Sequence, residues 1–320
     1  MTKRSLCSLL AVLFLLFCLC CAHHKNTPTT SGGYTVTDDT GRKVKLPSKP
    51  HRIVSLTYGT DEMLFALVKP ERIAAISKWS DYPEISFLSK TETSQVTNRV
   101  EPNTESIMQY KPGLVLVSVS TGMDAAHILE DMGIPVYVTS SPKSIQELQE
   151  KILGVAKVVG EESQGKYVIE QMNKRLSVLE EKLHTITAEK QKVCVAFGFT
   201  GAIGRKGYLM DNMMRLAHLR NGSAEAGLEQ GNVISKEQVI AKNPDVIFLP
   251  AWNFGHTEDD SGRYKKEFMQ DPAWQTVTAV QDKEVFIMPE RYRYAASQHI
   301  VEGIEAYASM AYPELFKKEE

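Results

Sequence analysis

The sequence predicts an α/β protein of two similar lobes with mainly parallel sheets, joined by one long bridging helix. Two observations support this fold class: a long helical pattern in the middle of the chain, and a motif that occurs once on each side of that pattern. Short apolar runs also alternate with helical segments in both halves, which is typical of parallel α/β sheets. We therefore expect a first lobe at 34–160, the bridging helix at 161–188 and a second lobe at 189–320.

The bridging helix is predicted from Glu161 to about Ala188. Its apolar residues recur at steps of three and four and so share one stripe of a helix; they are Ile169, Met172, Leu176, Leu179, Leu183 and Ile186. Glu161 and Glu162 stand where the helix dipole favours acids, and Lys190 and Lys192 follow the helix end. About 26 residues at a rise of roughly 1.5 Å each make a rod of about 40 Å, which could join two lobes.

The repeated motif predicts the same local fold on both sides of this helix. In each copy a capping residue precedes a glutamate by two positions, a proline follows that glutamate by seven, and an apolar run follows the proline. This order predicts a short helix, a turn closed by proline and a buried strand. The copies contain Asn103, Glu105 and Pro112 in the first lobe, and Ser235, Glu237 and Pro244 in the second.

The N-terminal segment is expected to be a targeting signal rather than part of the fold. Lys3 and Arg4 precede an apolar run at 9–19, and small residues follow it. The run is too short and its flanks are wrong for a good membrane span. Residues 22–33 are rich in Thr, Ser, Gly and Pro and are expected to form a flexible tether.

The cysteines at the end of the apolar run indicate a bacterial lipoprotein signal peptide at 1–21. Cys21 is the expected lipidated N-terminus of the mature chain, because small Cys20 precedes it. Cys18 and Cys20 are alternative lipidation sites, since Cys18 stands where such signals usually carry leucine. Secretion with cleavage after Ala22 and no lipid is a further alternative.

The two lobes are expected to begin and end with recognisable elements. An Asp/Gly turn separates two alternating runs at 34–46, which predicts a hairpin. Capping-box spacing at 144–147 predicts a helix that continues to 159, and further helices are expected at 61–68 and 298–312. Buried strands are expected at 52–56, 72–77, 114–117 and 134–138 in the first lobe, and at 192–197, 246–249 and 284–288 in the second.

Aromatic and arginine side chains follow the carboxyl ends of these strands, where α/β sheets bind ligands. Such residues suit a bulky, flat or partly anionic ligand, although each aromatic alone could simply pack its own loop. The predicted ligand-binding residues are Tyr58, Trp79 and Tyr82 in the first lobe, beside Ser120, and Phe199, Tyr208, Trp252, Phe254, Arg291, Tyr292, Arg293 and Tyr294 in the second.

Composition and motifs weigh against several other functions. A net charge of −2 argues against a nucleic-acid partner. Cys194 is the one cysteine beyond the signal, so no disulfide framework is expected, and its apolar strand favours a core role over a nucleophilic one.

The glycine-rich segment 198–207 lacks phosphate-loop and dinucleotide spacing and is expected to be a flexible cleft loop, where Arg205 and Lys206 could meet an anion. No HExxH or GxSxG motif is present, so we expect no enzyme.

Several sequence motifs together resemble one known family. They are Val-Thr-Asp-Asp-Thr-Gly-Arg-Lys-Val, Arg-Ile-Val-Ser-Leu and Asn-x-Glu-x-Ile with Lys-Pro in the first lobe, and Ser-x-Glu-Gln-Val, Asn-Pro-Asp-Val-Ile and Asp-Pro-x-Trp in the second. Across nearly all of the mature chain this pattern resembles the helical-backbone, periplasmic-type substrate-binding proteins that serve ABC importers of iron–siderophore complexes, haem or cobalamin.

The resemblance implies a cleft between two lobes and a bridging helix that limits hinge motion. It also implies that Glu105 and Glu237 dock on arginines of the importer's permease subunits; the alternative is that each glutamate only serves its helix N-terminus. We accordingly expect an extracytoplasmic, lipid-anchored or periplasmic monomer that has no resident cofactor. Its cargo is expected to be a ferric siderophore first, cobalamin second and haem third, with Tyr292 or Tyr294 as the iron ligand if haem is bound.

Two alternatives remain beside this interpretation. A receptor for free zinc or manganese shares the fold, but it needs converging histidines and carboxylates. The histidines show no paired spacing, so no metal site is assigned, although His256 and His299 could reach the cleft; the others are His51, His127, His184 and His218. A lipid-anchored enzyme on this scaffold is the second alternative, and it would show substrate turnover in place of a ligand-induced fluorescence change.

The first prediction concerns anchoring. We expect the mature chain to begin at a lipid-modified Cys21, because the apolar segment ends in a cysteine cluster. Mass spectrometry of the mature N-terminus measures both the start residue and the added lipid mass. An unmodified chain that begins at His23 would contradict the prediction.

Overall fold

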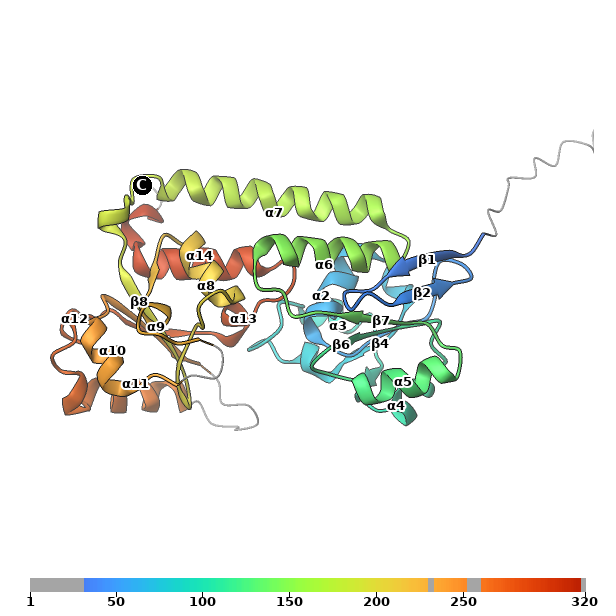
Figure 1. The fold of residues 1–320 in the computed structure, drawn as a ribbon, viewed down its shortest axis with the longest axis horizontal. Helices are drawn as coiled ribbons and strands as arrows, with labels where there is room; N and C mark the ends of the chain where they lie inside the picture. The colour runs from blue at the N-terminus through green and yellow to red at the C-terminus, as the bar shows by residue number, and fades with distance from the viewer. Residues whose placement is uncertain (1–31, 230–232, 252–259, 318–320) are drawn as a thin grey trace, which may run out of the picture.

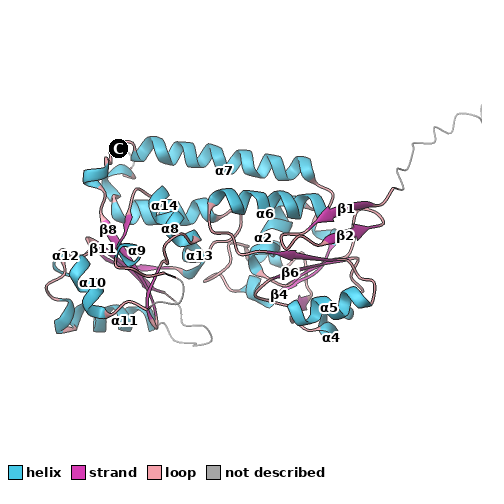
Figure 2. Ribbon diagram, viewed as in Figure 1, coloured by secondary structure: helices cyan, strands magenta, loops and turns pink. Residues whose placement is uncertain are grey.

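Two α/β lobes lie beneath one long helix, α7 (Glu162–Leu183), in the computed structural model, which describes residues 32–229, 233–251 and 260–317 (Figure 1). One lobe precedes α7 in the sequence and the other follows it (Figure 2). Both lobes contain a sheet whose strands are mainly parallel. The predicted fold class, two similar lobes joined by a bridging helix, is confirmed.

The first lobe is built on a sheet that is parallel throughout. Across the sheet the strands are β5 (Arg99–Val100), β4 (Ile73–Ser77), β3 (Ile53–Ser55), β6 (Leu114–Ser118) and β7 (Val136–Thr139). β6 and β7 are buried along their whole length, as expected for a parallel sheet with both faces covered. The chain runs from β3 to β4 and β5 on one side, then to β6 and β7 on the other, so the strand order reverses between β3 and β6.

The second lobe has a similar sheet of four parallel strands and one antiparallel strand, β9 (Gly201–Ile203). Across its sheet the parallel strands are β10 (Arg220–Asn221), β8 (Val193–Gly198), β11 (Val246–Pro250) and β12 (Val285–Met288). Here the order reverses between β8 and β11. Both sheets therefore have a switch point, and in α/β folds ligands bind outside the carboxyl ends of strands at such points.

The glycine-rich segment 198–207 forms a hairpin where the sequence predicted only a loop. β9 (Gly201–Ile203) pairs antiparallel with β8, and Gly198 lies opposite Gly201. Gly201 has φ of +136°, which a residue with a side chain rarely adopts, so glycine permits this tight reversal. The predicted N-terminal hairpin is also present, since β1 (Tyr34–Thr37) pairs antiparallel with β2 (Lys43–Leu46).

The helices cover both faces of the two sheets. In the first lobe they are α2 (Tyr58–Leu67), α3 (Lys90–Thr93), α4 (Thr104–Met108), α5 (Met123–Asp131) and α6 (Ile145–Val158). In the second lobe they are α8 (Leu209–Leu216), α9 (Gly222–Glu225), α10 (Lys236–Lys242), α11 (Asp260–Gln270), α12 (Thr278–Gln281), α13 (Glu290–Arg293) and α14 (Ile300–Ala311). Single 3₁₀ turns occur at Pro70–Arg72, Lys78–Asp81, Ala188–Lys190, Pro272–Trp274 and Pro313–Leu315.

The repeated motif folds alike in both lobes. The side chain of Asn103 accepts a hydrogen bond from the backbone N–H of Ser106 (2.9 Å) at the start of α4, and Ser235 does the same for Gln238 (3.2 Å) at α10. Lys111 and Asn243, which precede the two prolines, both have left-handed φ values, 45° and 44°. The two copies therefore share a capped helix, a left-handed turn residue and a buried strand.

The bridging helix is shorter than predicted, because it ends at Leu183 rather than near Ala188. Thr185, Ile186 and Thr187 follow, and such a run of β-branched residues disfavours helix. Ile186 is still partly buried against the core, so its apolar pattern reflects packing outside the helix. None of the described helices combines the length and apolar character needed to cross a bilayer.

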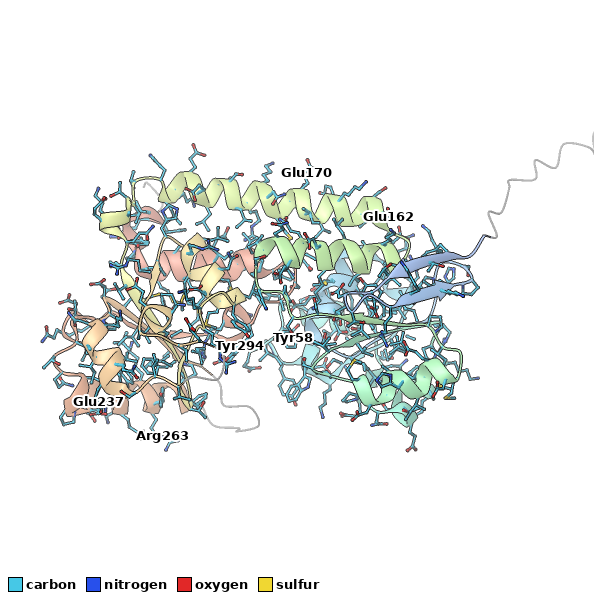
Figure 3. The ribbon with its side chains drawn as sticks, viewed as in Figure 1. Tyr58, Glu162, Glu170, Glu237, Arg263 and Tyr294 are labelled. Carbon is cyan, nitrogen blue, oxygen red and sulfur yellow. The ribbon has the colours of Figure 1, made fainter. Side chains whose placement is uncertain are left out.

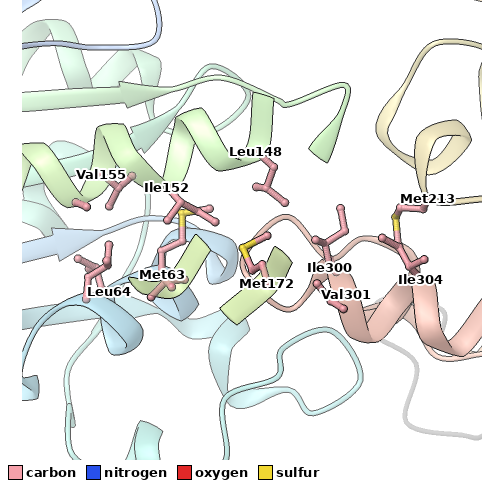
Figure 4. Close-up of a cluster of buried hydrophobic side chains, with 14 of the residues drawn as sticks. Met63, Leu64, Leu148, Ile152, Val155, Met172, Met213, Ile300, Val301 and Ile304 are labelled. Carbon is pink, nitrogen blue, oxygen red and sulfur yellow. The ribbon is translucent and has the colours of Figure 1, made fainter. Parts of the chain in front are cut away.

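An apolar core continues from one lobe to the other beneath α7. Leu64 and Ile152 of the first lobe, Met172 of α7 and Ile300 and Ile304 of α14 belong to one buried cluster (Figure 4). Two further clusters fill the opposite faces of the two sheets. The lobes are thus joined by shared packing as well as by the covalent chain.

Ion pairs tie α7 to the second lobe along its solvent side. Arg175 of α7 contacts Glu302 and Glu305 of α14, each at 2.7 Å. The Arg175 side chain is 42% exposed, so these pairs add little stability compared with the apolar core.

The second prediction concerns the close approach of α6 and α7. A Cβ atom at Gly165 would lie 2.5 Å from the Cβ of Ala156, so Gly165→Ala forces the helices apart. Overpacking costs about 1–3 kcal/mol and better helix propensity returns up to about 1 kcal/mol, so we expect a net loss of about 1–2 kcal/mol in urea unfolding.

Gly262→Ala in α11 is the matched control, because an added Cβ there meets no atom within 4 Å. It is expected to leave the unfolding free energy unchanged or to raise it by roughly 0.5–1 kcal/mol. Equal stability of the two variants would contradict close packing at Gly165.

Candidate ligand-binding site

A cavity of about 690 Å³ lies between the lobes at the carboxyl ends of their strands. Its first-lobe wall comes from the segments after β3, β6 and β7, and its second-lobe wall from the β8–β9 hairpin, α8 and the segment after β12. The switch point of each sheet therefore opens into the same space. Ligand pockets typically measure roughly 300–1,000 Å³, so this cavity could enclose much of a medium-sized organic ligand.

Hydroxyl groups dominate the first-lobe wall. Ser118 Oγ and Ser120 Oγ lie 3.0 Å apart, and Ser120 also donates its backbone N–H to Ser118 Oγ (3.3 Å). The serine and threonine residues of this wall are Thr57, Ser118, Ser120, Thr121, Ser140 and Ser141. Each hydroxyl can donate or accept, so the wall can match oxygen atoms of a ligand.

Lys151 of α6 adds a buried positive charge to the same wall. Its side chain is among the buried residues, and Nζ donates to the carbonyl oxygen of Ser140 (3.1 Å). Burial lowers the pKa of Lys151 to about 8, and the nearby carboxylate of Asp39 partly opposes this effect. Lys151 was not predicted, although a lysine on the same helical stripe as Leu148, Ile152 and Val155 was a signal that could have found it.

The second-lobe wall is largely apolar. Ile203 of β9, Leu209 and Met210 of α8, and Leu228 face the cavity. Arg205 lies among them and is exposed. The charged side chains among the described lining residues are Lys151, Arg205 and Arg293, with no carboxylate among them, so the cavity favours negative charge.

Tyr58 and Tyr294 connect the lobes beside the cavity. The Tyr58 hydroxyl donates to the carbonyl oxygen of Tyr294 (3.2 Å), and both residues lie where the lobes meet in Figure 3. Gly59 approaches the backbone of Ala296 so closely that an added Cβ would lie 3.3 Å from its carbonyl oxygen. Burial raises the pKa of both tyrosines, so their hydroxyls stay protonated.

Arg293 lines the cavity but is already engaged by the protein. Its Nη1 donates to Glu290 Oε1 (2.7 Å), and Nη2 donates to the carbonyl oxygen of Phe197. Glu290 in turn accepts from the backbone N–H of Ala251 (3.0 Å). Both side chains of this ion pair are almost fully buried, so Arg293 mainly fixes the segment after β12 against β8 and β11.

Other predicted residues lie elsewhere. Arg291 and Tyr292 pack on Phe87 across the lobe boundary, and Arg291 Nη1 donates to the carbonyl oxygen of Pro83 (3.3 Å). Trp79 and Tyr82 pair with each other at 5.7 Å on the surface. Phe199 packs on Tyr264 (5.5 Å). None of these five predicted residues lines the cavity, whereas Tyr58, Tyr208, Arg293 and Tyr294 do; Trp252 and Phe254 lie outside the described residues.

A second contact between the lobes centres on Glu62 of α2. Its carboxylate accepts from the Phe87 N–H (2.8 Å), from Ser86 Oγ (3.2 Å) and from Ser297 Oγ of the second lobe (2.5 Å). Its carbonyl oxygen accepts from Gln298 Nε2 (2.9 Å). Burial raises the pKa of Glu62, while these donors oppose the rise. The contact therefore joins both lobes through one buried carboxylate.

None of the histidines that the structure describes lines the cavity. His218 contacts Glu180 of α7 at 3.0 Å, and His299 contacts Glu302 three residues later at 3.1 Å. Among the described residues, no three histidine, cysteine or carboxylate side chains come together as a metal site. His256 lies outside the described residues.

Glu105 and Glu237 occupy matching places on the surface. Each is exposed in the first turn of its short helix, α4 or α10. The pKa of Glu237 is lowered by hydrogen bonds that its carboxylate accepts from the Glu237 backbone N–H and from the side chain of Ser235. α4 and α10 lie one in each lobe, on the side of the molecule away from α7 (Figure 1).

Comparison with known proteins gives concordant matches. A family model described as periplasmic binding protein matches residues 53–292. The ABC transporter substrate-binding lipoprotein YvrC of Bacillus subtilis is 26% identical over 292 residues, which cover 89% of this chain and 87% of that protein. The molybdate-binding protein MolA of Haemophilus influenzae is 23% identical over 312 residues, which cover 88% and 86%.

A solved structure has the same fold. The periplasmic haem-binding protein RhuT from Roseiflexus, in its apo form, matches with a TM-score of 0.69 at 20% identity, over 83% of this chain and 99% of that one. The ligands that RhuT and MolA are named for, haem and molybdate, differ in size and chemistry. Similarity at this level therefore identifies a fold and a family of binding proteins but does not choose a ligand.

Proposed function

We propose that this chain, which belongs to the periplasmic binding protein family and is a substrate-binding component of an ABC transporter, captures an iron–siderophore-type metal chelate between its lobes. The family consists of substrate-binding proteins rather than enzymes. The observation that carries the proposal is the cavity of about 690 Å³, with a hydroxyl-rich wall, an apolar wall and cationic side chains.

The charges of the cavity favour a chelate over a bare metal ion. Zinc or manganese sites need histidine, thiolate or carboxylate ligands, and a nearby ammonium or guanidinium repels a divalent cation. Lys151 and Arg205 would instead attract a complex whose organic arms carry negative charge. The apolar wall around Ile203 and Leu209 would cover the carbon skeleton of such a complex.

Among chelates, a ferric siderophore fits best, followed by cobalamin and then haem. Anionic siderophore arms match the cationic cavity, whereas the edge of cobalamin consists largely of neutral amides. Haem binding through a tyrosine requires a phenolate, but burial raises the pKa of Tyr294, one of the two candidate iron ligands. Tyr292, the other candidate iron ligand, packs on Phe87 away from the cavity lining.

The same proposal places the protein outside the cytoplasm. The relatives YvrC and YhfQ of Bacillus subtilis are named as substrate-binding lipoproteins, which supports an extracytoplasmic location. Anchoring through Cys21 would hold the protein near its importer, and the polar stretch 22–33 would act as the tether. Function as a monomer is part of the proposal.

The third prediction tests the cargo. We expect the mature protein to bind a ferric siderophore at one site, more tightly than cobalamin or haem, because of its cationic and hydroxyl-lined cavity. Isothermal calorimetry with each compound measures affinity, and the visible spectrum of protein purified from its native cells shows any coloured cargo already bound. Binding of free zinc or manganese alone would overturn the proposal.

The fourth prediction tests delivery by Glu105 and Glu237. The double change Glu105→Lys and Glu237→Lys should abolish uptake into cells or proteoliposomes, because both docking carboxylates would meet permease arginines with the wrong charge. Each single variant should show partial loss. Ligand affinity should stay almost unchanged, since both residues lie on the surface in the first turns of α4 and α10.

A matched control reverses two glutamate charges on the opposite side of the molecule. Glu162 and Glu170 are exposed on α7 (Figure 3), so Glu162→Lys with Glu170→Lys should transport normally. If the Glu105 and Glu237 double variant also transports normally, the two glutamates serve only their helix N-termini.

A further inference from the structure

We propose that Lys151 and the serine hydroxyls at the ends of β6 and β7 form a subsite for an anionic oxygen arm of the cargo. The inference rests on the proposed function, because it takes the cavity between the lobes as the cargo site. It goes further by naming the group that the first lobe recognises: a carboxylate or catecholate oxygen.

Lys151 is an unusual residue for its position. It is 6% exposed and lies on the same face of α6 as buried Leu148, Ile152 and Val155. One of its three N–H groups donates to the carbonyl oxygen of Ser140 (3.1 Å). Among the described residues, Asp39 is the carboxylate that acts on this ammonium, and it does so through its charge without a direct hydrogen bond. A buried charge without an ion-pair partner is costly, and an anionic ligand would offset that cost.

The nearest carboxylate, Asp39, is already occupied. Its Oδ1 accepts from the Tyr137 hydroxyl (3.0 Å), and its Oδ2 accepts from the backbone N–H (2.8 Å) and Oγ (3.1 Å) of Ser140. Asp39 thereby fixes the segment that carries the Ser140 carbonyl group, and this carbonyl positions Lys151. The ammonium is held in place but its charge is not neutralised by direct contact.

The serines give the subsite additional donors. Ser118, Ser120 and Ser141 line the same wall as Lys151. The Ser118 and Ser120 hydroxyls are 3.0 Å apart, so one can donate to the other while the second donates to a ligand oxygen. An ammonium with adjacent hydroxyl donors suits an anionic oxygen, since hydrogen bonds to charged groups are stronger than neutral ones.

Lys151 also predicts how affinity depends on pH. The carboxylate of Asp39 acts on it, and Tyr137 is hydrogen-bonded to Asp39. The other titratable or charged residues that line the same cavity are Tyr58, Arg205, Tyr208, Arg293 and Tyr294. Burial lowers the pKa of Lys151 to about 8 in the free protein. Raising the pH from 7 to 9 should therefore remove most of its charge and weaken anionic chelates by roughly tenfold, with little effect on a neutral chelate.

The fifth prediction compares Lys151→Met with Lys157→Met. Both changes remove one lysine from α6, but Lys157 is exposed and serves as the control. The probes are ferric citrate, an anionic ferric tris-catecholate and a neutral ferric trihydroxamate, titrated by calorimetry at pH 7 and pH 9. We expect Lys151→Met to lose roughly ten- to hundredfold affinity for an anionic probe, to bind the neutral probe as the wild type does, and to lose the pH dependence.

The outcomes separate failure of the subsite at Lys151 from failure of the proposed function. Loss of citrate binding alone identifies a carboxylate arm, and loss of tris-catecholate binding alone identifies a catecholate arm. Unchanged affinity for every chelate in Lys151→Met overturns the subsite but leaves the proposed function intact. Wild-type protein that binds only zinc or manganese overturns both. Thermal melting confirms that Lys151→Met is folded, which is expected because methionine replaces a buried charge with an apolar side chain.

Discussion

The apolar core beneath α7 is the constraint on which the arrangement of the lobes depends. Met172 of α7 shares one cluster with Ile152 of the first lobe and Ile300 of the second. Parting the lobes there would expose apolar surface at a cost of roughly 25 cal/mol per Å², and bending α7 would break backbone hydrogen bonds. The spacing of the two cavity walls is therefore set by packing that lies outside the cavity.

Beside the cavity the lobes are joined by hydrogen bonds rather than by apolar packing alone. Tyr58 and Glu62 reach the second lobe through hydrogen bonds to Tyr294, Ser297 and Gln298. The exposed hydrogen bond from Tyr58 to Tyr294 can be replaced by water and costs little to rearrange, whereas the buried contact of Glu62 with Ser297 would leave unsatisfied polar groups if it parted. The fold thus combines a fixed spacing under α7 with local contacts that can adjust around a ligand, and adjustment is expected in the segments that carry Tyr58 and Tyr294.

Periodic patterns made much of the fold predictable, because burial imposes them on helices and strands. The repeated motif even foretold two matching turns, at Lys111 and Asn243. The candidate site was less predictable. Arg291 and Tyr292 follow a strand as expected, but packing on Phe87 turns them away from the cavity. Residue type and strand position cannot reveal such long-range pairings. The burial of Lys151, in contrast, could have been predicted from the sequence, because this lysine lies on an apolar helical stripe.

The two buried cations of the cavity show how the walls divide their roles. Arg293 is neutralised by Glu290 three residues earlier, and its remaining contacts fix the second-lobe backbone. Lys151 has only a carbonyl oxygen in direct contact, and its neighbouring carboxylate is engaged by Tyr137 and Ser140. A charge that the protein has already neutralised contributes little to attracting a ligand, while an unneutralised one contributes most in a poorly hydrated cavity. If the cavity holds the proposed anionic cargo, its charge would be met by Lys151 of the first lobe and by exposed Arg205 across the cavity, while Ile203 and Leu209 of the second lobe would cover its carbon skeleton.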